Sequence, residues 1–308
     1  MRVPSLPTQR RLVALAAAAL VVAGAMPALA APVVVASIKP IHSLVAAVMQ
    51  GAGTPELIVS GASSPHNYAL KPSDAVHLQR ADLVVWVGPD LENFLISPLA
   101  TLSSGEKLLT LEGVTGVKTL APRVGGTFEA DTDGDQAGRI DPHIWLDPLN
   151  ARAMVDAIAE RLSAMDPDNA DLYSANARAE DARLDALIVQ TRADLAPIKG
   201  KPFVVFHDAY HYFENRFGLS ASGSIVVEPD VAPGVQRLRA IRARVEELGA
   251  TCVFSEPEFE PRLVDTLIEG TAAKKGVLDP LGAAIPQGPD HYFSLIRALS
   301  GSLVACLG

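Results

Sequence analysis

The chain has 308 residues, of which 49% are hydrophobic and 20% are charged, and its formal net charge is −9. This acidic balance argues against a nucleic-acid-binding protein, because such proteins need clustered lysine and arginine to neutralise phosphates. The length is sufficient for one large core or for two lobes.

The first 30 residues have the pattern of a secretory signal peptide. Three arginines within the first 11 residues precede an alanine-rich apolar stretch from 12 to 26, and Ala28-Leu29-Ala30 has the small-x-small form of a cleavage site. The apolar stretch is short for a membrane span. We therefore expect export into the periplasm and a mature chain that begins at Ala31.

The first half of the mature chain alternates short apolar segments with helical patterns. Strands are predicted at 33–37, 57–60, 82–88 and 108–111, and helices at 41–50, 72–80 and 91–99. Pro72-Ser73-Asp74 is typical of a helix start, because Ser73 or Asp74 can cap the first backbone amides. Such alternation indicates right-handed βαβ units and a mostly parallel sheet.

From 124 to 140 the periodic pattern is lost. Four glycines alternate with Glu129, Asp131, Asp133 and Asp135. The spacing does not match the calcium loop of an EF-hand. We interpret the stretch as a solvated surface loop, with weak recruitment of cations as the alternative.

The segment Asp141–Pro148 follows this loop and places His143 between two Asp-Pro pairs. Proline disfavours the helical conformation in the residue before it, so each pair starts a new local geometry. A histidine held in such a bend can be a metal ligand, an acid/base group, or simply a hydrogen-bonded turn residue. Only partners elsewhere in the chain can distinguish these possibilities.

Two helices and a second βα series complete the chain. The helices are predicted at 150–165 and 169–195, and the second of them would be roughly 40 Å long, enough to join two lobes. Further strands are predicted at 203–206, 224–227 and 252–256, and 277–282 is predicted as a strand that ends in a turn. Helices are predicted to end at 217 and to span 235–248, 262–275 and 292–303. We expect an N-terminal α/β lobe at 31–168, an interlobe helix at 169–197 and a C-terminal α/β lobe at 198–308.

The only two cysteines are Cys252 and Cys306. An even pair in an exported protein predicts a disulfide. Metal ligation is the alternative, but neither cysteine lies in a CxxC motif or at a ligand spacing from a histidine.

His66, His143, His207 and Asp279 all lie in predicted loops at or near the ends of βα units. Ligands of open α/β sheets bind at the carboxyl ends of the strands. Three imidazoles and one carboxylate form a four-coordinate set that suits Zn²⁺. The expected fold is therefore α/β, with two lobes of mostly parallel sheet, a long rigid helix between them and a metal site in the interlobe cleft.

Four segments of the chain resemble the zinc-specific solute-binding proteins of ABC transporters. They are 63–88, with Pro65-His66 and Pro72-Ser73-Asp74; the Asp141–Pro148 stretch; His207–Glu214; and Leu278–Gly282. The resemblance covers nearly the whole mature chain. It implies two α/β lobes joined by one rigid helix, and a cleft that holds the metal.

The resemblance also implies the roles of individual residues. His66, His143 and His207 match the zinc histidines of the family, and Asp279 matches a carboxylate that is either a direct ligand or replaced by water. Cys252 and Cys306 match a disulfide found in some members. The expected partners are Zn²⁺ and an inner-membrane ABC permease with its ATPase, and the chain is expected to be a monomer.

Two features depart from the family pattern. Many zinc members have a histidine-rich loop before the second ligand, whereas the loop at 125–138 has acids and no histidine. Some members have a glutamate immediately before the first ligand, and here that residue is Pro65.

Four histidines are not assigned to the site. His77 and His211 lie on predicted helices and are interpreted as solvated or packing residues, His42 as a candidate to support the site, and His291 as a helix-start residue. Two other functions remain open. One is an exported zinc hydrolase with Asp208 or Glu256 as its base, although no HExxH or GxSxG motif supports it. The other is a periplasmic zinc buffer without a transporter.

Overall fold

The computed structural model describes residues 1, 31–102, 107–123, 128, 138–226, 231–249, 252–259 and 262–308. The predicted signal peptide and most of the acidic loop lie outside the described residues. The chain divides into two units, 1–30 and 31–308, and the helices and strands of the described residues belong to the second. Among the described residues no helix is both long and apolar enough to cross a membrane.

The first sheet has four parallel strands in the order β2-β1-β3-β4. These strands and their helices are β1 (Val34–Ile38), α1 (Lys39–Val48), β2 (Glu56–Val59), α2 (Pro72–Arg80), β3 (Leu83–Trp86), α3 (Asn93–Leu102) and β4 (Leu108–Thr110). Strand β1 is buried along its whole length, as an inner strand of a parallel sheet must be. The predicted start of α2 is confirmed, since the Asp74 carboxylate accepts a hydrogen bond from the Lys71 amide at 2.8 Å.

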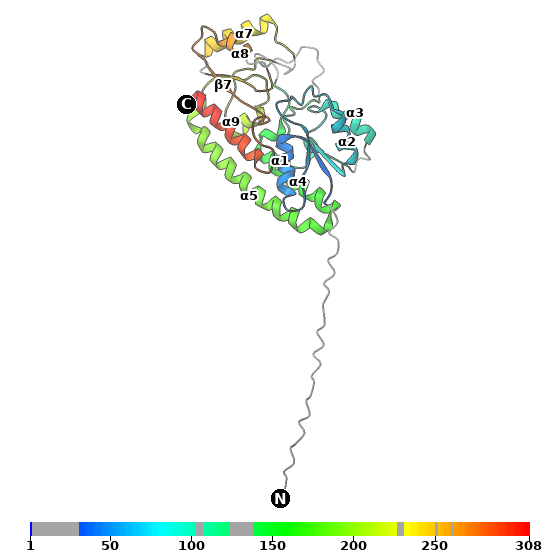
Figure 1. Cartoon of the computed structure of the whole chain (residues 1–308). Coiled ribbons are helices and arrows are strands. Elements are labelled where there is room, and N and C mark those ends of the chain that lie inside the picture. Colours follow the sequence, from blue (N-terminus) through cyan, green and yellow to red (C-terminus); the bar gives the residue numbers. More distant parts are fainter. Residues whose placement is uncertain are drawn as a thin grey trace. The chain divides into compact units, whose positions relative to one another are not determined.

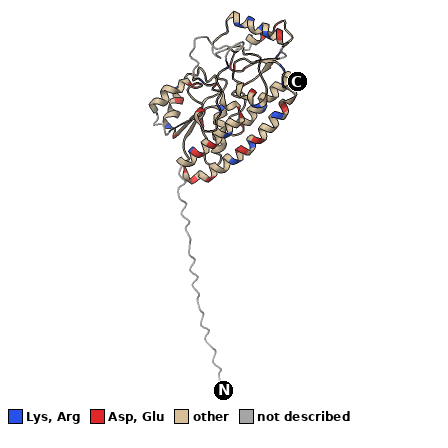
Figure 2. Cartoon of the chain, turned by 180° about the vertical axis from the view of Figure 1, so that it is seen from behind, with Lys and Arg blue, Asp and Glu red and all other residues tan. Residues whose placement is uncertain are grey.

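The middle of the chain forms α4 (Pro148–Met165) and α5 (Ala170–Leu195). The Asp147 side chain caps α4 by accepting from the Leu149 amide at 2.9 Å. Helix α5 packs against α4, α1 and α9, so it contacts both halves of the chain (Figure 1). Acidic and basic residues are interspersed along α5 (Figure 2).

The second half begins with β5 (Phe203–Val204) and α6 (His211–Phe217), followed by α7 (Val235–Leu248), β6 (Cys252–Ser255), α8 (Arg262–Ile268), β7 (Lys274–Val277) and α9 (His291–Leu307). Its sheet is also parallel, in the order β5-β6-β7. With two parallel sheets and the long helix, the predicted α/β class is confirmed.

Three elements differ from the prediction by more than a shift of their ends. The helix predicted at 262–275 ends at Ile268, because Gly270 turns the chain with a positive φ of 74°. The strand predicted at 277–282 instead runs from Lys274 to Val277 and pairs with β6. In place of a strand at 224–227 the described residues form a single parallel bridge between Val205 and Ser224.

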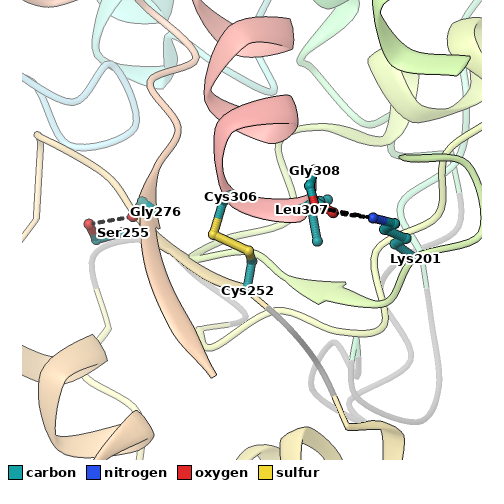
Figure 3. The surroundings of a disulfide bond; sticks show 7 residues. All are labelled: Lys201, Cys252, Ser255, Gly276, Cys306, Leu307 and Gly308. Atoms are coloured by element: carbon teal, nitrogen blue, oxygen red, sulfur yellow. Dashed lines mark hydrogen bonds between the residues drawn. A yellow bond between two sulfur atoms is a disulfide. The ribbon is translucent and has the colours of Figure 1, made fainter. Parts of the chain in front are cut away.

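The predicted disulfide is confirmed. Cys252 at the start of β6 bonds to Cys306 near the end of α9, with their Cα atoms 6.1 Å apart (Figure 3). The Lys201 ammonium donates to the carbonyl of Leu307, so the last turn of α9 is fixed from a second side (Figure 3).

Two hydrophobic cores fill the described part of the chain. The larger one includes β1 and β3 of the first sheet as well as Leu278 and much of α9, so both halves share it. The smaller one lies between the second sheet and helices α7 and α8. The lobe boundaries at 168/169 and 197/198 stay a prediction.

Candidate metal site

Three histidines from separate segments meet in the structure. His66 lies in the loop between β2 and α2, His143 directly precedes the short 3₁₀ turn Ile144–Leu146, and His207 lies between β5 and α6. One ring nitrogen of each lies within 4.8 Å of the other two. The three rings have centroids 5.2–5.7 Å apart.

The spacing of two of these nitrogens matches a shared metal ion. Nε2 of His207 lies 3.3 Å from Nε2 of His143. Two nitrogens bound to one tetrahedral zinc at about 2.0–2.1 Å each would lie about 3.3–3.4 Å apart. The donor set and its geometry therefore fit Zn²⁺.

Each of these two imidazoles contacts a carboxylate through its other ring nitrogen, Nδ1. Nδ1 of His143 lies 2.7 Å from Asp141 Oδ1, and Nδ1 of His207 lies 2.7 Å from Glu256 Oε2. A carboxylate that accepts a hydrogen bond from Nδ1 fixes the tautomer in which Nε2 is unprotonated and has a free lone pair. The carboxylate also makes Nε2 a better metal ligand. Sequence reasoning assigned no role to Asp141 and considered Glu256 only as a catalytic base.

The surroundings shift the pKa values of the site in opposite directions. Burial, and then the neighbouring His143 and His207, hold the pKa of His66 well below its ordinary value. Burial is the largest influence on the pKa of His207 and acts to lower it, but the charge and hydrogen bond of Glu256, together with the charges of Asp208 and Asp141, outweigh it and the net shift is upward. For Asp141, hydrogen bonds from His143 and His211 overcome burial and lower the pKa to about 2. Asp141 is therefore a charged acceptor across the physiological range.

The fourth predicted ligand, Asp279, is occupied by its own turn. Its carboxylate accepts hydrogen bonds from the amides of Leu281, Gly282 and Ala283 at 3.0, 2.7 and 2.6 Å. Among the described residues, the group of mutually close ligand atoms contains the three histidines and includes neither Asp279 nor Glu258. Its role as a ligand stays a prediction.

A carboxylate that sequence reasoning did not identify lines the same pocket. Both oxygens of Glu258 are buried, and neither has a hydrogen-bond partner among the described residues. Burial, followed by the negative charges of Asp279 and Glu256, raises the pKa of Glu258 to about 9. The only hint in the sequence is that Glu258 follows the predicted strand 252–256 at its carboxyl end.

The space enclosed by these groups is very small. The cavity measures about 10 Å³, and its walls combine the three histidines, Glu256 and Glu258 with apolar side chains, namely Trp145, Phe259, Pro280 and Leu281. A wider groove of about 500 Å³ adjoins it, and Ser64, Glu258 and Phe259 line both spaces. The inner cavity suits a single ion.

Comparison with known proteins agrees with this site. Residues 34–306 match the family model described as zinc-uptake complex component A, periplasmic (ZnuA). The chain belongs to the ZnuA family. It is 48% identical to the high-affinity zinc uptake system protein ZnuA of Brucella abortus (strain 2308), over 89% of this chain and 91% of that protein. It is 38% identical to the ZnuA protein of Yersinia pestis, over 91% and 92% of the two chains.

Comparison with solved structures also finds ZnuA proteins. A crystal structure of ZnuA superposes with a TM-score of 0.77 at 26% identity, covering 90% of this chain and all of the other. The zinc-bound 138-173 deletion mutant of ZnuA superposes with a TM-score of 0.73 at 25% identity, covering 90% and 98%. A periplasmic zinc-binding protein from Treponema pallidum, at 20% identity over 90% and 99% and a TM-score of 0.76, has the same fold.

In this member of the ZnuA family, hydrogen bonds tie the two halves together around the histidines. The Trp145 indole donates to the Pro280 carbonyl at 2.8 Å, and the Tyr292 hydroxyl donates to the Trp145 carbonyl at 2.7 Å. Arg216 forms a two-point ion pair with Asp147, at 2.6 and 2.7 Å. These contacts fix the position of His143, in the first half, relative to His207, in the second.

Arg123 adds a further ion-pair cluster beside the site. Its guanidinium donates to Asp208 through Nε at 2.9 and 3.0 Å and to Glu214 through Nη1 at 2.8 Å. Asp208 follows His207 directly in the chain. The cluster therefore connects the start of the acidic loop to the backbone that carries His207.

The remaining histidines of this ZnuA family member serve other contacts. Nε2 of His42 pairs with the Pro55 carbonyl at 3.1 Å, so it does not support the site as considered from the sequence. His77 pairs with Glu56 on the surface of the first half. His211 is closer to the site than expected, with Nδ1 3.6 Å from Asp141 Oδ2. His291 is the first residue of α9, as predicted.

Proposed function

We propose that this chain is a periplasmic zinc-binding protein that captures one Zn²⁺ with His66, His143 and His207 and delivers it to an inner-membrane ABC permease. The observation that carries the proposal is the 3.3 Å separation of the His143 and His207 Nε2 atoms, each backed by a carboxylate at Nδ1. The zinc uptake named for the relatives agrees with it.

The proposed location rests on two features of the chain. The predicted signal peptide would direct export and be removed after Ala30. The Cys252–Cys306 disulfide suits an oxidising compartment such as the periplasm. We propose that the exported protein acts as a monomer and that the permease with its ATPase is its partner.

The hydrolase alternative has less support. A zinc hydrolase needs an open coordination position, a base near it and room for a substrate. Asp208 is engaged by Arg123, and Glu256 lies behind His207, where it contacts Nδ1. The inner cavity of about 10 Å³ leaves no space for an ester or a peptide beside the ion. These features favour a binding protein.

A titration of the metal-free protein tests the binding step. We expect one tight zinc per chain, with a dissociation constant in the nanomolar range or below, corresponding to about −12 kcal/mol or better. His143→Ala should abolish tight binding. Unchanged zinc affinity in His143→Ala would contradict the proposal, and so would turnover of a peptide or ester by the zinc-loaded wild type.

Delivery needs a separate experiment, because a zinc buffer would bind equally well. Zinc-loaded protein should stimulate the ATPase of its ABC permease after reconstitution in liposomes. The His143→Ala variant is the matched control and should not stimulate. Absence of stimulation by the wild type would favour the buffer alternative.

A further inference from the structure

Glu258 is a buried carboxylate whose oxygens accept no hydrogen bond from the described residues. Both oxygens are shielded from solvent, and no described residue donates a hydrogen bond to either of them. Buried polar groups in folded proteins almost always have partners, so an exception needs an explanation. A ligand that arrives from outside the chain is one such explanation.

The position of Glu258 indicates which ligand this is. The side chain lines the same cavity as His66, His143 and His207. It also lines the wider groove of about 500 Å³ that adjoins this cavity. Glu258 therefore stands where the groove meets the three imidazoles, and an ion that enters from the groove meets its carboxylate on the way to the histidine nitrogens.

The local chain explains why this carboxylate is free while its neighbour is not. Strand β6 ends at Ser255, and Glu256 follows with its Oε2 on Nδ1 of His207 and its Oε1 3.1 Å from the Tyr210 hydroxyl. Pro257 cannot donate a backbone hydrogen bond. Glu258 then enters the cavity wall beside Phe259 and makes none of the contacts that hold Glu256.

Asp279 is a poorer source of a ligand oxygen. Both of its oxygens accept hydrogen bonds from the backbone amides of residues 281–283. Moving this carboxylate onto a metal would leave buried or half-buried amides without acceptors, which costs free energy for each bond lost. Glu258 would lose no such bond.

We propose, on the basis of the zinc-binding function argued above, that Glu258 supplies a carboxylate oxygen as the fourth ligand of the bound Zn²⁺, in place of Asp279. Zinc accepts carboxylate oxygens at about 2.0–2.2 Å and commonly combines them with imidazole nitrogens. Loading then gives the unpartnered oxygens of Glu258 their missing contact. The site is completed by three histidines and one glutamate.

Two measurements test this proposal. The first is zinc affinity by competition with a chelator, for wild type, Glu258→Gln, His207→Ala and the control Glu246→Gln, which makes the same chemical change at an exposed position on α7. We expect Glu258→Gln to weaken zinc binding by more than the roughly 10–100-fold that loss of an outer contact costs. We expect Glu246→Gln to bind as the wild type does.

The second measurement is a crystal structure of the zinc-loaded wild type, which decides the question even if Glu258→Gln fails to fold. It should place an oxygen of Glu258 within about 2.0–2.2 Å of the ion. Asp279 or water at the fourth position would overturn the proposal, as would wild-type affinity in Glu258→Gln. If His207→Ala then still loses binding, only the assignment of Glu258 fails. Full affinity in His207→Ala would overturn the proposed function itself.

Discussion

Oε2 of Glu256 lies 2.7 Å from Nδ1 of His207, and both side chains are almost completely buried. Asp141 forms the same contact with His143. In each case the carboxylate orients the ring and directs Nε2 toward the other histidine. The site therefore depends on residues that do not themselves touch the metal, and most of the predictions below follow from this arrangement.

Replacing Glu256 should weaken zinc binding without abolishing it. Glu256→Gln keeps the shape of the side chain but removes the charge that polarises His207. We expect a loss of roughly 10–100-fold in affinity. Chelator competition measures it, with Glu247→Gln on the exposed face of α7 as the control. Equal affinities in both variants would mean that Glu256 does not act on the ligand.

Replacing a clustered histidine and replacing a surface histidine should have very different effects on zinc affinity. His207→Ala removes one of the three clustered nitrogens and should lose most of the zinc affinity. His77→Ala removes a surface contact with Glu56 and should change little. Isothermal titration of both variants provides the comparison. Comparable losses would show that the clustered histidines are not the site.

Zinc affinity should fall as the pH is lowered, because protons and metal compete for the same nitrogens. The raised pKa of His207 means that this ring takes up a proton first as the pH falls. The lowered pKa of His66 means that it competes only at more acidic pH. We expect a decline that begins above the ordinary histidine value of about 6.5 and steepens below about 6. Affinity that stays constant from about pH 7.5 to 5.5 would point to carboxylate ligands instead.

The stability of the metal-free protein should also depend on pH, through Glu92. This side chain is fully buried beside β3, and burial raises its pKa to about 7 although the Gly88 and Val87 amides donate to it. Between about pH 4.3 and 7 the unfolded chain releases this proton while the folded chain keeps it. Folding stability therefore declines as pH rises through this window, by up to roughly 3 kcal/mol, and levels off above it.

Denaturant unfolding with a chelator present, from pH 4.5 to 8.5, measures this slope. Glu92→Gln cannot ionise, so its stability should decline less than that of the wild type over the same range. The comparison concerns the slope, because the amide also changes the hydrogen bonds at Val87 and Gly88. Parallel curves for the two proteins would exclude Glu92 as the titrating group.

Removing the disulfide should destabilise the fold. Cys252 and Cys306 are separated by 54 positions in the chain. The entropy of closing such a loop in the unfolded state corresponds to roughly 4 kcal/mol. Urea unfolding of the oxidised wild type and of the double variant Cys252→Ser/Cys306→Ser should differ by an amount of this order. Coincident unfolding curves would show that the last helix is held by packing alone.

Local patterns in the sequence predicted much of the fold. Apolar segments between helical patterns identified both parallel sheets, and Pro72-Ser73-Asp74 located the start of α2. The end of α8 was missed because the predicted helix runs through Gly270, which stops it in the structure. The strand Lys274–Val277 that follows depends on its pairing with β6. Such pairing is a tertiary interaction that residue composition does not encode.

The residues of the metal site also divide into those that the sequence indicated and those that depend on tertiary contacts. The three histidines follow strands or turns, and this placement together with the family resemblance predicted that they meet. The support from Glu256 depends on a contact across 49 residues of sequence, and the exposure of Glu258 to the cavity depends on which face of the loop after β6 turns inward. Neither feature can be inferred from the residues that are near it in the sequence. Asp279 looked equivalent to the histidines in the sequence, but its hydrogen bonds to residues 281–283 became visible only in the structure.

The size of the inner cavity has a consequence for which ions can enter it. At about 10 Å³ it has room for about one water-sized particle, so an ion must shed most of its hydration shell to enter it. Mg²⁺ gives up its waters reluctantly and prefers oxygen ligands, and Ca²⁺ requires six to eight of them. Three imidazole nitrogens, apolar side chains and the two carboxylates of Glu256 and Glu258 supply far fewer oxygens than these ions need, whereas zinc exchanges water for imidazole favourably. The hard cations are therefore excluded by the cost of dehydration, and no group in the cavity wall needs to repel them.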